Sequence, residues 1–148
     1  MNPELLRSTL ETVLERESAI TPRFYQILFT RYPQVRPLFG GNSSKAQEEM
    51  LQRSLIAVVD NLENASWLTS TLSALGAKHV AYGVTREMFD WVGDALLTAL
   101  SEVLDEQWSD AVAMEWAEAY GVIRDLMLTG MREAVTPPRA PESASYVS

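Results

Sequence analysis

Apolar residues recur at helical spacing along almost the whole chain. In each run they fall three or four positions apart, the spacing that places them on one face of a helix. The runs cover residues 6–14, 24–29, 51–62, 68–75, 89–103 and 112–127. The alternation of apolar and polar residues that is typical of strands does not occur. The pattern therefore predicts an all-α fold of about six to eight helices with short connections.

Capping residues and prolines mark where these helices begin and end. Asn2-Pro3 and Thr21-Pro22 are typical helix starts, and Thr85 is an expected cap for a later helix. Pro33 is expected to end the second helix at Tyr32 and to open a short turn, PQVRPLF.

Two further local features concern the later helices. Ser44 stands three residues before Gln47, the spacing of a capping box, ahead of a long amphipathic helix. Gly121 interrupts the apolar stripe of the last helix, and we expect another helix to come close at this position.

Length and composition predict one domain with a short tail. The chain has 148 residues and is 47% hydrophobic, enough for one sizeable core. We expect residues 1–134 to form that domain and the proline- and serine-rich residues 135–148 to be disordered. A net charge of -8 argues against nucleic acid and against an anionic membrane as partners. No secretory signal or membrane span is visible, so we expect a cytoplasmic protein.

His79 is the only histidine, and it ends the ladder Leu68, Leu72, Leu75 and His79 on one helix face. An imidazole at an apolar position either finds a hydrogen-bond partner in the interior or binds a metal or a cofactor iron. A single histidine excludes the HExxH motif and sites with two histidines, and the absence of cysteine excludes thiolate sites. A bare metal ion would need carboxylates on the same face, and the ladder has none.

One imidazole in a core rich in leucine, valine, phenylalanine and methionine suits a flat apolar cofactor with a single axial bond. Haem fits this description, because a neutral imidazole binds its iron while the porphyrin needs a dry, closely packed cleft. Tyr25 and Gln47 are polar residues at otherwise apolar positions.

Six segments in this order and spacing resemble the globins, over roughly residues 3 to 133. They are FYQILF (24–29), PQVRPLF (33–39), QEEML (47–51), LGAKHVAYGV (75–84), FDWVGDALL (89–97) and WAEAYG (116–121). The resemblance is closest to bacterial single-domain globins and to the haem domain of flavohaemoglobins.

This resemblance implies a globin fold around haem b, with His79 as the proximal iron ligand. It also implies that Phe39 packs on the porphyrin face and that Tyr25, Gln47 and Leu51 form the distal pocket. Around the porphyrin edge it implies three apolar residues, Val84, Phe89 and Val92.

Each of these assignments has a structural alternative. Phe39 could be an ordinary core residue, and the Tyr25 hydroxyl could simply donate to a backbone carbonyl. Gln47 could instead complete the capping box with Ser44. Leu51 and the three edge residues would be apolar in an ordinary core as well.

The implied function is reversible binding of O2, CO and NO, with hydrogen bonds from Tyr25 and Gln47 that slow O2 release. Flavohaemoglobins also imply NO dioxygenation, for which this chain would need a separate reductase. Those proteins place a tyrosine and a glutamate behind the proximal histidine, where this chain has Phe89 and Met131. A weaker proximal push follows, which disfavours peroxidase chemistry.

Two other functions are compatible with the same sequence. One is a haem-free helical sensor or scaffold module, and the other is a haem-based sensor that signals to a partner protein. Oligomeric state stays open between a monomer and a homodimer, and so does the choice among storage, sensing and NO detoxification.

Overall fold

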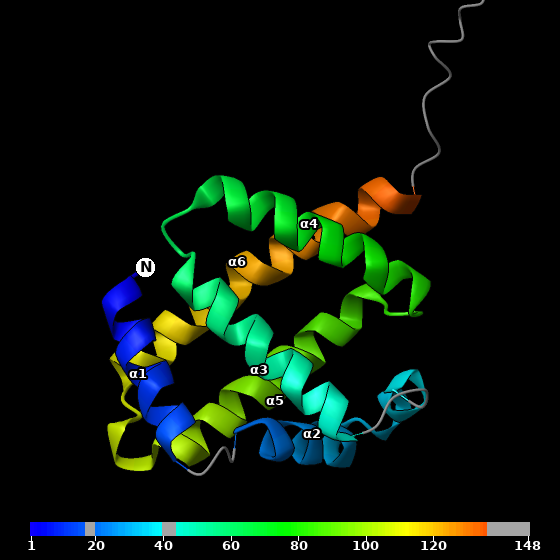
Figure 1. The fold of residues 1–148 in the computed structure, drawn as a ribbon. Coiled ribbons are helices and arrows are strands. Elements are labelled where there is room, and N and C mark those ends of the chain that lie inside the picture. Colours follow the sequence, from blue (N-terminus) through cyan, green and yellow to red (C-terminus); the bar gives the residue numbers. More distant parts are fainter. Residues whose placement is uncertain (17–19, 40–43, 136–148) are drawn as a thin grey trace, which may run out of the picture.

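A computed structural model describes residues 1–16, 20–39 and 44–135. Within these residues the chain forms six α-helices and two 3-10 helices and contains no strand. The elements are α1 (Pro3–Glu15), α2 (Ile20–Arg31), η1 (Pro33–Phe39), α3 (Ser44–Asp60), α4 (Ala65–Ala81), α5 (Arg86–Leu104), η2 (Asp105–Gln107) and α6 (Asp110–Val135). Figure 1 shows their arrangement. The prediction of an all-α fold is confirmed.

Most helix boundaries follow from capping chemistry. The side chain of Asn2 accepts a hydrogen bond from the Leu5 N–H at 3.1 Å, and Asn64 does the same for the Trp67 N–H at the start of α4. Helix α2 ends at Arg31 and Pro33 opens η1, as the proline predicts. The predicted helix start at Thr21-Pro22 is confirmed to within one residue, since α2 begins at Ile20. Thr21 is not its cap, because it lies inside the helix, 3% exposed.

The helices form two hydrophobic clusters. The larger one joins α1, α2, η1, α3, α5 and the first half of α6. The smaller one joins α4 to the second half of α6 and also includes Val58 of α3 and Phe89 of α5. Helix α4 packs mainly on α6, whereas α3 packs on α1 and α2. The two consecutive helices α3 and α4 therefore have different main neighbours (Figure 1).

Helices α4 and α6 cross at two glycines. A Cβ atom on Gly76 would lie 2.7 Å from the carbonyl carbon of Met127, and one on Gly130 would lie 2.6 Å from that of Ser73. Each glycine thus lets its helix touch the backbone of the other. The expectation for Gly121 is wrong, since a Cβ there would meet only the Arg124 guanidinium, at 3.9 Å.

The predicted tail lies almost wholly outside the described residues, since α6 continues to Val135. None of the described helices is long and apolar enough to cross a bilayer.

We expect Asp105→Gly to raise the free energy of unfolding by about 0.5 to 1 kcal/mol. Asp105 ends α5 with φ 47, and it is the one non-glycine residue with positive φ among those described. Glycine adopts this conformation without the clash that a Cβ creates. Thermal unfolding should show a rise in Tm, and Asp105→Ala, which keeps the Cβ, should show none. An equal gain for both variants would contradict the strain.

Candidate functional site

His79 lies in the last turn of α4, half-buried, and its ring is hydrogen-bonded to the main chain. Its Nδ1 lies 2.7 Å from the Leu75 carbonyl oxygen. A carbonyl oxygen only accepts, so Nδ1 carries the proton and Nε2 keeps its lone pair. Among the described residues, none forms a hydrogen bond with Nε2. Burial lowers the pKa of His79, against the opposing effect of the Leu75 hydrogen bond, and the ring is therefore a neutral imidazole.

Two aromatic rings flank the imidazole. Tyr82 meets it edge-on at a centroid distance of 5.5 Å, and Phe89 lies tilted at 6.3 Å. Phe89 is 5% exposed and belongs to the smaller cluster, together with Leu72 and Met127. The position of the imidazole is thus set by one hydrogen bond and by apolar packing.

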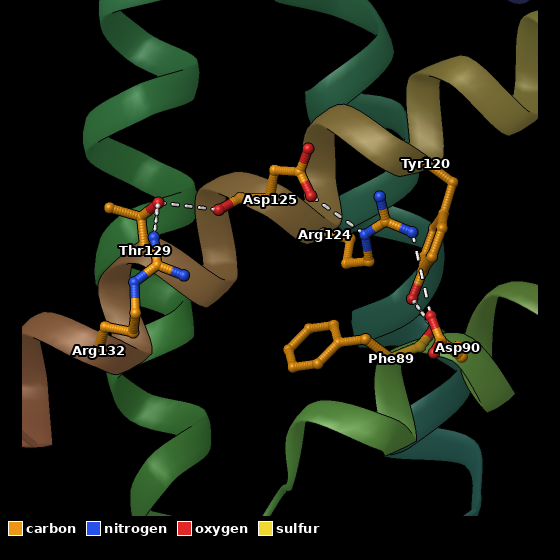
Figure 2. A network of polar contacts seen from close by, with 7 residues as sticks. All are labelled: Phe89, Asp90, Tyr120, Arg124, Asp125, Thr129 and Arg132. Atoms are coloured by element: carbon orange, nitrogen blue, oxygen red, sulfur yellow. Dashed lines mark hydrogen bonds and ion pairs between the residues drawn. The ribbon is translucent and has the colours of Figure 1, made fainter.

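Tyr120 fixes the first turn of α5, which carries Phe89. Its hydroxyl donates to the Phe89 carbonyl oxygen at 2.5 Å, as Figure 2 shows. Gly93 leaves room for the Tyr120 ring, because a Cβ there would lie 2.7 Å from it. Burial raises the pKa of Tyr120, so the phenol keeps its proton. The sequence pattern marked Tyr120 only as part of an apolar stripe and gave no sign of this hydrogen bond.

The same network continues along the surface of α6. Arg124 lies 3.9 Å from Asp90 on α5 and 3.1 Å from Asp125 (Figure 2). These are exposed ion pairs, worth little individually. The buried tyrosine hydroxyl is therefore the firmer link between α5 and α6.

An aromatic cluster of Tyr25, Phe29 and Phe39 joins α2 to η1. The Tyr25 and Phe39 rings meet edge-on at 5.7 Å, and Phe29 lies 5.4 Å from Phe39. All three rings are only partly buried, and they pack against the larger cluster. The structure thus brings two of the predicted site residues, Tyr25 and Phe39, into direct contact.

The Tyr25 hydroxyl points to the start of α3. It donates to the main-chain carbonyl of Gln47 across 3.3 Å, which is long for an O–H donor. This is the backbone contact that the sequence left open as an alternative. Burial, and secondarily the charge of Glu48, raise the pKa of Tyr25 to about 12. The phenol is therefore a proton donor throughout the neutral range.

Gln47 and Leu51 lie one turn apart on α3, both half-buried. The Gln47 side-chain amide bonds to none of the described residues. Helix α3 already begins at Ser44, whose side chain lies outside the described part, so the predicted capping box is not tested.

The predicted site residues fall into two groups. Tyr25, Phe39, Leu51 and Val92 pack against the larger cluster, whereas Val84 and Phe89 belong to the smaller one, beside His79. Within the described chain, no hydrogen bond or ring contact joins the aromatic cluster to His79. In addition, no three acidic or histidine side chains of this part gather as a metal ion would require.

Comparisons with known proteins agree with the all-helical fold described above. A family model described as Globin matches residues 22–127. The Flavohemoprotein of Bacillus cereus is 33% identical over 128 residues, which are 85% of this chain and 31% of that protein. The Flavohemoprotein of Rhizobium meliloti is 30% identical over 86% of this chain and 32% of its own length. The chain thus spans about a third of the curated relatives it matches.

Two solved structures share the fold at 26% identity. A bacterial globin from Campylobacter jejuni superposes with a TM-score of 0.76 over 88% of this chain and 94% of its own. An engineered carbene transferase from Rhodothermus marinus, described as a candidate nitric oxide dioxygenase, superposes with a TM-score of 0.78 over 88% of this chain and 91% of its own.

Proposed function

We propose a function from one premise: this chain belongs to the globin family. The proposal is that it binds haem b through Nε2 of His79 and reversibly binds O2, CO or NO on the opposite side. The observation that carries it is the imidazole itself. Nδ1 donates to the Leu75 carbonyl oxygen, while Nε2 of this half-buried residue forms no hydrogen bond with any described residue.

The residues around this nitrogen suit the group. Val84, Phe89 and Val92 would lie around the porphyrin edge and Phe39 on its face. Leu51 would line the distal pocket with Tyr25 and Gln47. Most of these apolar side chains are only partly buried, which leaves their surface to pack on a porphyrin. When bound, haem supplies an iron with one open coordination position for a diatomic gas.

The environment of His79 favours gas binding over peroxide chemistry. No carboxylate in the described part of the chain hydrogen-bonds to the imidazole, whose Nδ1 donates to a main-chain carbonyl. Phe89 lies beside the ring, and Met131 packs in the same cluster without any charge. A neutral imidazole donates less electron density than one paired with a carboxylate.

We expect Tyr25→Phe to raise the O2 dissociation rate about tenfold or more, because each hydrogen bond to a ligand contributes roughly 1 kcal/mol or more. The neutral phenol now makes a long bond to Gln47, which it can exchange for a ligand at little cost. Stopped-flow displacement of O2 by CO measures the rate. Phe29→Tyr, which adds a hydroxyl elsewhere in the cluster, is the control. An unchanged rate in Tyr25→Phe would show that this hydroxyl does not face the ligand.

A second activity, NO dioxygenation, is favoured by the candidate nitric oxide dioxygenase among the neighbours. In that reaction NO, O2 and one electron give nitrate, so an electron donor is required. Anaerobic and aerobic NO consumption, with and without a reductant, distinguishes it from simple gas binding. Consumption that needs both O2 and a reductant supports the activity.

The visible spectrum of the purified protein tests haem binding directly. A strong Soret band that shifts with CO is expected. A colourless protein that fails to take up added haemin would instead support a haem-free scaffold, and the proposal would then be withdrawn.

A further inference from the structure

Two long segments of this chain contain no acidic residue. Residues 18–47 contain four cations and residues 64–86 contain two, and neither segment contains an aspartate or glutamate. Together they carry +6, and since the whole chain carries -8, the remaining residues carry -14. The described parts of these segments include α2, η1, the start of α3, α4 and the first residue of α5, and they carry Tyr25, Phe39 and His79.

Both cations of the second segment are without a partner among the described residues. Lys78 near the end of α4 and Arg86 at the start of α5 are exposed, and neither forms an ion pair or hydrogen bond with a described residue. Arginines on α1, α2 and α6, in contrast, meet carboxylates. The pairs are Arg7–Glu63, Arg16–Glu106, Arg23–Glu102, Arg31–Asp94 and Arg124–Asp90.

An exposed aromatic ring lies between these two cations along the chain. Tyr82 is 56% exposed, and its ring meets the His79 imidazole edge-on. Figure 1 shows the end of α4 and the turn into α5 at one edge of the molecule. The ring therefore connects the solvent to the proposed axial ligand through a single contact.

We propose that Lys78, Tyr82 and Arg86, here named the corner surface, are the docking site for the acidic face of a flavin-bearing electron-donor protein. This inference rests on the proposed function. The contact between Tyr82 and His79 favours an electron donor over other acidic proteins. In the complex, the reduced flavin would give one electron to ferric haem held by His79, with no bond made or broken.

Charge complementarity selects the orientation of this partner. An acidic protein is repelled by the parts of the chain that carry -14, and it is attracted where cations stand without carboxylates. Glu87 is the first acid after the corner surface and lies in the first turn of α5. The two cations thus lie at the border between a positive segment and a negative one.

Charge reversal tests the proposal on the haem-loaded protein, with flavodoxin, a small acidic flavoprotein, as the probe. We expect Lys78→Glu and Arg86→Glu each to weaken flavodoxin binding at least about fivefold at low ionic strength, as measured by calorimetry. The rate of haem reduction by reduced flavodoxin should fall in parallel. Reduction by dithionite should stay unchanged.

Arg53→Glu is the matched control. Arg53 is an exposed cation on α3 without a described partner, two residues after the half-buried Leu51 and so on roughly the opposite face of the helix. Its reversal changes the net charge equally and should leave binding within about twofold.

The outcomes separate this inference from the proposed function. A normal Soret band with flavodoxin binding that is absent, or equally weakened by all three reversals, overturns the docking site and leaves haem binding intact. Self-association of the wild type that the two corner reversals abolish, without flavodoxin binding, would assign the surface to a second copy and also overturn it. A missing Soret band would instead contradict the proposed function.

Discussion

Gly76→Ala and Gly130→Ala should each lower the free energy of unfolding by about 3 kcal/mol or more. The added methyl group would overlap a backbone carbonyl of the facing helix, of Met127 in one case and of Ser73 in the other. A backbone carbonyl cannot rotate away as a flexible side chain can, so α4 and α6 must separate. Urea titration of the purified variants measures the loss.

Gly121→Ala is the control on the same helix. A Cβ there would make only an ordinary contact with the Arg124 side chain, and alanine favours a helix over glycine by about 1 kcal/mol, so this variant should be as stable as the wild type or more so. Equal losses at Gly121 and Gly130 would show that the crossing is not the cause.

Separation of α4 and α6 should also change the position of the His79 imidazole. Gly76 lies three residues before His79 on α4, and α4 packs mainly on α6. A shift at the crossing therefore moves His79 relative to Phe89. In the haem-loaded ferrous protein, we expect a changed iron–histidine stretching frequency in Gly76→Ala, which a loss of stability alone would not produce.

The helices could be predicted because their signals are local. Asn2 and Thr85 cap helices, Pro33 ends one, and the apolar spacing of residues 89–103 reports a buried face. Asn64 carries the same capping signal and could have been found in the same way.

The helix contacts could not be predicted, because a glycine in the sequence does not indicate which part of the chain packs against it. Gly121 interrupts an apolar stripe and suggested a helix contact, yet a Cβ there would meet only the Arg124 side chain, while Gly76 and Gly130 form the crossing. Only the fold brings Ser73 and Met127 to these positions. Thr21 is not a helix cap for a related reason, since its burial depends on tertiary packing.

The sequence could indicate side chains of the candidate site, but not the main-chain carbonyls that accept hydrogen bonds from them. His79 was predicted from its place in the apolar ladder and from the resemblance to globins, and Phe39 and Tyr25 were predicted from that resemblance. The carbonyls of Leu75, Gln47 and Phe89, which accept from His79, Tyr25 and Tyr120, leave no mark in the sequence. These contacts decide which nitrogen of His79 is free and which way the Tyr25 hydroxyl points.

Replacing His79 with alanine should lower haem affinity by more than about 100-fold, because even residues that only support a metal ligand contribute ten- to 100-fold. The loss should appear as a Soret band that is weak or absent and as lost CO binding. Without haem, the fold should lose only about 1 kcal/mol, because the one hydrogen bond removed is that to the Leu75 carbonyl. Haem titration and urea unfolding of the apoprotein separate the two effects.

A cavity variant makes the assignment specific to the imidazole. In His79→Gly, added imidazole should restore the Soret band and CO binding, since the free base can occupy the space beside Phe89 and supply the missing nitrogen. The neighbouring Lys78→Ala, which removes an exposed side chain, should bind haem as the wild type does. A His79→Ala protein that keeps haem with unaltered absorption would show that another residue is the axial ligand. The roles proposed for Tyr25, Phe39 and the corner surface would then be withdrawn, because each depends on His79 as that ligand.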